Sequence, residues 1–196
     1  MIELLTSKGP ARLVEFRARR TRATLVLGHG AGGGGTAPDL AAIAEALPAQ
    51  GVTVVLHEQP WKVAGRKVAA APPVLDICWV ESLAQYPRSG PLIVGGRSAG
   101  ARVACRTAAH VGADAVVALA FPLHPPGRPA KSRVAELSVD VPLRIVQGQR
   151  DPFGRPEEFP AGLDLVAVPG DHRLRQGLAE VVAAVQAFVD SPRIPV

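Results

Sequence analysis

The chain carries a serine, an aspartate and a histidine, in that order, each placed just after a short apolar run. Ser98 lies in the stretch "LIVGGRSAGARVA" between Gly96 and Gly100, Asp151 follows "LRIVQGQR", and His172 follows "LVAVPGD". A serine hydroxyl becomes a nucleophile when a histidine accepts its proton and a carboxylate orients that histidine. The spacing G-x-S-x-G permits the sharp strand-to-helix turn that exposes such a serine. We therefore predict Ser98 as a nucleophile, His172 as its base and Asp151 as the acid that orients the histidine.

A second stretch that could take part in chemistry is the glycine-rich "LVLGHGAGGGG", Leu25 to Gly35. Such a loop can cradle a nucleotide's phosphates, hold a dinucleotide, or present backbone N–H groups to an oxyanion. A phosphate loop needs a lysine where this chain has Thr36. The dinucleotide pattern G-x-G-x-x-G is matched by Gly28, Gly30 and Gly33. A dinucleotide-dependent oxidoreductase is therefore an alternative prediction.

The order of the predicted elements favours the oxyanion interpretation of the glycine loop. A predicted hairpin precedes the strand 23–30 that leads into the glycine loop. In a dinucleotide-binding fold, the strand that leads into the glycine loop is instead the first strand of the domain. Glu58, at the end of the next apolar run, could still bind the ribose of a dinucleotide. In the oxyanion interpretation, the backbone N–H groups of Ala31 and Ala99 are the two predicted donors.

The elements that must position these residues alternate between apolar runs and amphipathic stretches. Strands are predicted at 2–7, 11–19, 23–30, 52–60, 90–96, 113–122, 141–151 and 163–171. Helices are predicted at 37–51, within 77–86, at 98–112 and at 174–190, with Thr36 as a cap of the first. Continuous Val/Ile/Leu strands alternating with helices indicate a mostly parallel sheet that is covered on both faces. We predict a single domain over residues 1–196, with Ser98, Asp151 and His172 at carboxyl ends of its strands.

The motifs "GHGAGG", "GGRSAG", "GQRDPFG" and "GDH" resemble those of small α/β-hydrolases, specifically the lidless, dienelactone-hydrolase-like branch. The resemblance spans essentially the whole chain. It implies the α/β-hydrolase fold, a mostly parallel central sheet with helices on both faces and no lid domain. It also implies a serine hydrolase that cleaves small carboxylic esters or related acyl compounds. Dienelactone hydrolases have a cysteine where this chain has Ser98, so lactone cleavage does not carry over. Because the branch includes chromatin-complex subunits, a catalytically inactive interaction module is a further alternative.

Several other polar residues compete for roles at this site. Arg97 adjoins the nucleophile, where it could form a structural ion pair or bind an acidic substrate. His124, in "FPLHPPG", is a candidate substrate-binding residue and the rival of His172 as base. Asp171 neighbours His172 but would need an awkward turn to orient its ring. His29 is expected to support the backbone of the glycine loop.

Composition and charge exclude little. The net charge is +5, but the only basic cluster is Arg17–Arg22, which is interpreted as a solvated face rather than a nucleic-acid site. No apolar run has the length of a membrane helix, and the N-terminus lacks a signal-peptide pattern, which predicts a cytoplasmic protein. Cys78 and Cys105 lack metal-ligand spacing. We expect no metal or cofactor, a small-molecule substrate, and neither nucleic acid nor membrane as a partner; the oligomeric state is left open.

Overall fold

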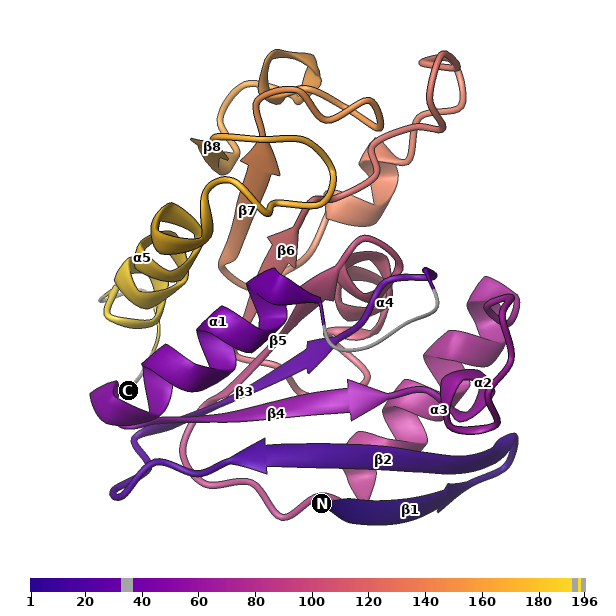
Figure 1. The fold of residues 1–196 in the computed structure, drawn as a ribbon, viewed down its shortest axis with the longest axis vertical. Helices are drawn as coiled ribbons and strands as arrows, with labels where there is room; N and C mark the ends of the chain where they lie inside the picture. Colours follow the sequence, from indigo (N-terminus) through magenta and orange to yellow (C-terminus); the bar gives the residue numbers. More distant parts are fainter. Residues whose placement is uncertain (33–36, 192–193, 195–196) are drawn as a thin grey trace.

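A single eight-stranded sheet runs through the computed structural model, which describes residues 1–32, 37–191 and 194 (Figure 1). In the order of the sheet, the strands are β1 (Ile2–Thr6), β2 (Gly9–Phe16), β4 (Val52–Glu58), β3 (Ala23–Gly28), β5 (Leu92–Arg97), β6 (Ala115–Leu119), β7 (Leu143–Gly148) and β8 (Asp164–Val168). Strands β1, β2 and β4 pair in antiparallel fashion, and all pairs from β4 to β8 are parallel. The predicted hairpin and the mostly parallel sheet are both confirmed.

Helices cover both faces of the sheet (Figure 1). Helix α1 (Pro38–Ala46), continued by the 3₁₀ turn η1 (Leu47–Gln50), packs on one face beside α5 (Leu178–Val189). Helices α3 (Pro72–Ala84) and α4 (Ala99–Thr107) pack on the other face. The remaining short helical turns are α2 (Pro60–Val63), η2 (Val134–Leu137) and η3 (Pro156–Glu158).

The strand β3 shows why the central strands read as unbroken apolar runs. Successive side chains of a strand point to opposite faces. Leu25 and Leu27 belong to the buried cluster that includes α1 and α5, whereas Val26 belongs to the cluster that includes α3 and α4. Because both faces are covered by helices, every position of the strand is buried, and all positions but Thr24 are apolar. The predicted covering of both faces is therefore confirmed.

The element boundaries differ from the predicted ones where a local feature overrides periodicity. The last helix begins at Leu178 rather than at Leu174, because Leu174 has a φ of +51° that no α-helix contains. The predicted strand 52–60 ends at Glu58, since Pro60 begins α2. Thr36, the predicted helix cap, lies outside the described residues, and Ala37 is the N-cap.

The segment between β6 and β7 contains no lid. Residues 120–142 form loops and the 3₁₀ turn η2, so nothing larger than a single helical turn is inserted there.

The order of the strands in the sheet differs from that of a dinucleotide-binding fold, in which the first three parallel strands follow one another toward the same edge of the sheet. Here β5 lies on the opposite side of β3 from β4. Gly33, the third glycine of the dinucleotide pattern, lies outside the described residues.

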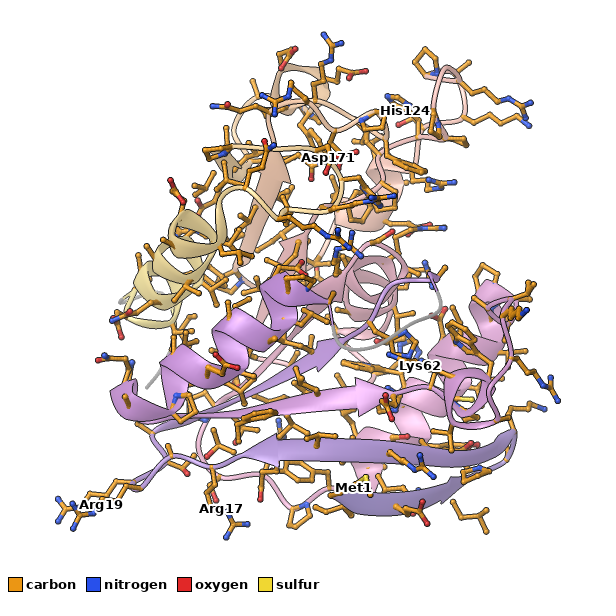
Figure 2. All side chains as sticks on the ribbon, viewed as in Figure 1. Met1, Arg17, Arg19, Lys62, His124 and Asp171 are labelled. Carbon is orange, nitrogen blue, oxygen red and sulfur yellow. The ribbon has the colours of Figure 1, made fainter. Side chains whose placement is uncertain are left out.

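The basic cluster lies far from the carboxyl ends of the parallel strands. Figure 2 shows Arg17 and Arg19 at the opposite end of the molecule from His124 and Asp171. Arg17 forms an ion pair with Glu15 at 3.0 Å.

In the described part of the chain, no helix is long and apolar enough to span a membrane.

Candidate active site

Ser98 occupies a sharp turn between β5 and α4. Its φ is +54°, a conformation that an L-residue adopts at a cost and that recurs at functional sites. The turn closes tightly against the end of β3: a Cβ added to Gly96 would lie 2.4 Å from the Gly28 oxygen, and one added to Gly100 would lie 2.3 Å from it. Glycine is therefore required on both sides of the serine, because the backbones approach too closely for any side chain.

This close approach gives a prediction for stability. We expect Gly100→Ala to lower the free energy of unfolding by about 3 kcal/mol, which corresponds to a melting temperature roughly 6–12 °C lower. The new methyl group would overlap backbone atoms of Gly28, which cannot move without disturbing β3. Thermal unfolding followed by circular dichroism measures the change. Gly32→Ala is the matched control, since an added Cβ there meets nothing within 4 Å. Equal melting temperatures for the two variants would contradict the requirement for glycine at position 100.

His172 lies between Ser98 and Asp151 and forms hydrogen bonds to both. Its Nε2 is 2.9 Å from the Ser98 Oγ, and its Nδ1 is 2.8 Å from Oδ2 of Asp151. A carboxylate only accepts hydrogen bonds, so Nδ1 carries the proton and Nε2 is free to accept one from the serine. The structure therefore brings together the three residues that the sequence singles out. They come from the ends of three strands, β5, β7 and β8.

Asp151 is held by contacts that the sequence did not reveal. Its side chain is fully buried, and Oδ2 also accepts a hydrogen bond from Nε2 of Gln147 at 2.9 Å. Oδ1 accepts one from the backbone N–H of Phe153 at 2.8 Å. The Phe153 ring in turn packs against the His172 ring, with centroids 4.2 Å apart. These contacts fix the carboxylate in the orientation that the histidine needs.

Residues 169–177, between β8 and α5, form the loop that carries His172, and this histidine loop lies against the end of β7. A Cβ added to Gly148 would lie 2.6 Å from the backbone oxygen of Asp171, so the loop lies directly against the strand. Asp171, the weaker candidate acid, accepts a hydrogen bond from the N–H of Arg173 at 2.8 Å. This contact caps the turn that carries His172.

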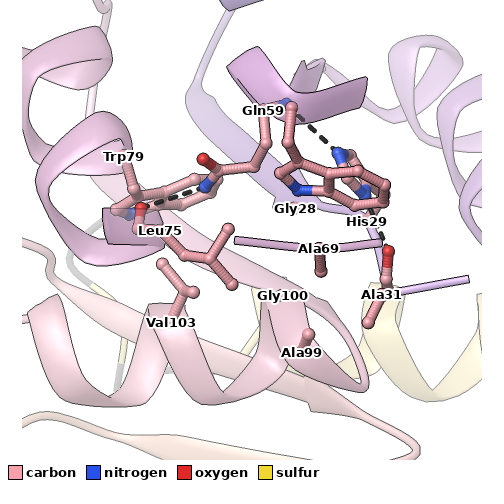
Figure 3. A pocket seen from close by; sticks show the side chains of 12 residues that line it. Gly28, His29, Ala31, Gln59, Ala69, Leu75, Trp79, Ala99, Gly100 and Val103 are labelled. Carbon is pink, nitrogen blue, oxygen red and sulfur yellow. Dashed lines mark hydrogen bonds between the residues drawn. The ribbon is translucent and has the colours of Figure 1, made fainter. Parts of the chain in front are cut away.

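A narrow, mostly apolar cavity lies beside Ser98, with Ala31 and Ala99 in its wall (Figure 3). Apolar side chains of α2 and α3 and of the loop between them, including Trp61, Leu75 and Trp79, line the rest of it. The enclosed space holds roughly one water molecule. Ala99 begins α4, where the first N–H groups of a helix have no partner within it.

His29 braces the glycine loop beside this cavity (Figure 3). Its Nε2 accepts a hydrogen bond from the backbone N–H of Gln59 at 3.1 Å, so its Nδ1 carries the proton and donates it to the Gly30 oxygen at 2.8 Å. Burial lowers the pKa of His29, which favours the neutral ring. The ring thereby joins the loop to the end of β4.

Arg97 and His124, the candidate substrate-binding residues, both make contacts within the protein. Arg97 forms an ion pair with Asp39 at 3.4 Å and donates a hydrogen bond to the backbone oxygen of His172 at 2.7 Å. The ring nitrogens of His124 lie 2.9 Å from the Pro125 oxygen and 2.9 Å from Oε2 of Glu158. The hydrogen bond to the Pro125 oxygen and the Glu158 carboxylate raise the pKa of His124.

No cluster of three or more metal-ligating side chains occurs among residues 1–32, 37–191 and 194. Both cysteines are buried free thiols, and burial raises the pKa of Cys105 to about 12. Neither thiol is therefore activated as a nucleophile.

Comparison with known protein families identifies the chain. Residues 21–176 match the family model described as an alpha/beta hydrolase domain, and this range contains Ser98, Asp151 and His172. The chain belongs to the α/β-hydrolase family. The absence of an insertion between β6 and β7 makes it a small, lidless α/β-hydrolase.

Solved structures of bacterial proteins share this α/β-hydrolase architecture. A lidless α/β serine hydrolase from Xanthomonas campestris matches with a TM-score of 0.79 and 21% identity, over 100% of this chain and 94% of the other. An α/β serine hydrolase homologue from Coxiella burnetii gives 0.74 and 17%, over 95% and 96%. Est1E from Butyrivibrio proteoclasticus, with bound ferulic acid, gives 0.73 and 15%, over 96% and 98%. A search of curated proteins gave no match.

Proposed function

We propose that this α/β-hydrolase is a serine hydrolase that cleaves small carboxylic esters or related acyl compounds through an acyl-enzyme. The observation that carries the proposal is the chain of hydrogen bonds from Ser98 through His172 to the buried carboxylate of Asp151. Its geometry suits proton removal from the serine, because Nε2 lies within hydrogen-bond reach of Oγ. No cofactor takes part in the proposed reaction.

The first half of the reaction acylates the serine. Oγ of Ser98 attacks the carbonyl carbon of the ester while Nε2 of His172 takes its proton. Asp151 stabilises the resulting imidazolium without itself becoming protonated. When the tetrahedral intermediate collapses, the carbon–oxygen bond to the alcohol breaks, and the alcohol leaves with the proton from Nε2. The acyl group stays on Ser98.

The second half releases the acid. His172 takes a proton from a water molecule, which attacks the acyl carbon, and then returns that proton to Ser98 as the acyl bond breaks. In both halves, the amides of Ala31 and Ala99 donate hydrogen bonds to the oxygen that becomes negative. Such preorganised donors stabilise a developing charge strongly, because they need no reorganisation during the reaction. The placement of both residues at the cavity beside Ser98 supports this assignment.

Labelling with a fluorophosphonate tests the proposed function. This reagent forms a covalent bond with an activated serine, so the intact mass of the protein should rise by one adduct. A folded protein that takes up no adduct would contradict the proposal and favour an interaction module with the same fold.

The small cavity predicts a preference for short acyl chains. The site lacks a lid, and its enclosed space holds roughly one water molecule, so a long alkyl chain stays largely in water. Each methylene left exposed forgoes about 0.8 kcal/mol, or roughly fourfold in binding. We expect acetyl and butyryl p-nitrophenyl esters to be hydrolysed with a higher kcat/KM than decanoyl or palmitoyl esters. An optimum at the longer chains would reveal an acyl pocket that this chain does not form by itself.

A further inference from the structure

The side chain of Arg97 contacts three segments that meet at the site. Its Nη2 donates a hydrogen bond to the main-chain oxygen of His172 at 2.7 Å. Its Nε lies 3.4 Å from Oδ2 of Asp39, in the first turn of α1. Its Nη1 packs against Gly30, where an added Cβ would lie only 3.4 Å from it. The guanidinium thus joins the histidine loop, α1 and the glycine loop to the end of β5.

Asp39 gives this arrangement a fixed anchor. Its side chain is fully buried, and that of Arg97 is 16% exposed. Burial raises the pKa of the Asp39 carboxyl, while the Arg97 cation opposes the rise. A buried carboxylate needs such a partner, because removing a charge from water is costly. The ion pair therefore holds the guanidinium inside the protein, facing the histidine loop.

The planar guanidinium suits this double contact. Its charge is delocalised over a rigid planar group, so its Nε side can pair with the charge of Asp39 while Nη2 donates a hydrogen bond to the His172 oxygen. A lysine ammonium is a compact point charge on a flexible stem and could satisfy fewer of these contacts at once. Nη2 of Arg97 donates to the protein's own main chain and Nε lies in ion-pair contact with Asp39, which argues against substrate binding as its main role.

We propose that Arg97, anchored by Asp39, is a positioning residue that keeps the ring of His172 in place beside Ser98. The inference rests on the proposed hydrolase function. The main-chain oxygen that Arg97 holds belongs to the same residue whose ring must reach the Ser98 Oγ. A shift of about 1 Å in a reacting group can cost roughly 100-fold in rate.

Steady-state kinetics of three variants tests the inference: Arg97→Met, Arg97→Lys and Asp39→Asn. Each is compared with the wild type on neutral p-nitrophenyl acetate and on a p-nitrophenyl ester that carries a carboxylate. For Arg97→Met, we expect kcat to fall about 10- to 100-fold with both esters while KM changes less than about twofold. Arg97→Lys and Asp39→Asn are expected to give smaller losses of kcat, again without a change in KM.

Arg106→Met is the matched control. Arg106 is a partly buried arginine on α4, 21% exposed, that forms ion pairs with Asp76 at 2.7 Å and Glu136 at 3.0 Å. Its replacement removes comparable ion pairs at a place that does not contact the histidine loop. We expect kcat to stay at the wild-type value, so the control separates a general loss of stability from loss of positioning.

Two results would overturn the inference. One is a kcat for Arg97→Met equal to that of the wild type; the other is a KM that rises only for the carboxylate ester, which would make Arg97 a substrate-binding residue. If Arg97→Met does not fold, Arg97→Lys and Asp39→Asn decide by the same criterion. A wild type without esterase activity or labelling would instead refute the proposed function itself.

Discussion

Ser98→Ala should abolish both ester hydrolysis and labelling by a fluorophosphonate, while the protein keeps its fold. Removing Oγ takes away the atom that forms the acyl bond in the proposed reaction, and removal of a triad nucleophile costs about 10⁶-fold in kcat. The side chain of Ser98 makes a hydrogen bond to His172 and fills little space, so alanine is compatible with the turn. Turnover of p-nitrophenyl acetate and intact mass after labelling measure the loss, and circular dichroism checks the fold.

Ser82→Ala is the matched control for this experiment. Ser82 is also a buried serine beside a histidine, with its Oγ 3.0 Å from Nε2 of His57. However, burial lowers the pKa of His57 to about 3, and no described residue bonds its Nδ1, so this pair lacks the carboxylate that a triad needs. We expect labelling and turnover to survive in this variant. Equal labelling of the Ser98→Ala variant and the wild type would overturn the assignment of the nucleophile.

His172→Ala should lower kcat/KM by about four to six orders of magnitude. Without the imidazole, nothing accepts the proton of Ser98, and the alcohol must leave without an acid. The kcat/KM of the variant on p-nitrophenyl acetate, compared with that of the wild type, tests the role of the base.

His124→Ala is the comparison for the second experiment. His124 is buried and hydrogen-bonded to Glu158, but its contacts lie in the loops after β6 and β7 rather than with Ser98. We expect kcat/KM of this variant to remain near the wild-type value. If the two histidine variants exchanged their behaviour, the base would be His124 and not His172.

The sequence predicts the fold and the meeting of the three site residues because both follow from simple regularities. Parallel strands bring their carboxyl ends to one edge of the sheet, so residues that follow three such strands must converge there. Ser98, Asp151 and His172 each stand within a few residues of the end of an apolar run, and the structure joins them by hydrogen bonds of 2.9 and 2.8 Å. The role of the glycines that flank Ser98 is also predictable from the sequence, because a close approach between two backbones leaves glycine as the only residue that fits.

The supporting residues could not be predicted in the same way. Gln147 lies within β7 and reads as an ordinary strand residue, yet its amide bonds Asp151. Asp39 reads as a favourable charge in the first turn of a helix, although its side chain is buried against Arg97. Both contacts depend on the side-chain geometry of segments that meet only in the folded chain. Local patterns carry no signal for them.

The order of the strands also has a consequence for how the protein gains activity as it folds. Ser98 and His172 are 74 residues apart along the chain, and their contact requires β5 to β8 to be paired in parallel. Contacts so distant in sequence carry a large loop-closure entropy, and sheets built from them form slowly. The β1–β2 hairpin, whose contacts are local in sequence, contributes none of the three site residues. The proposed activity therefore requires nearly the whole sheet to be assembled, because the C-terminal strand β8 must have joined it before His172 can reach Ser98.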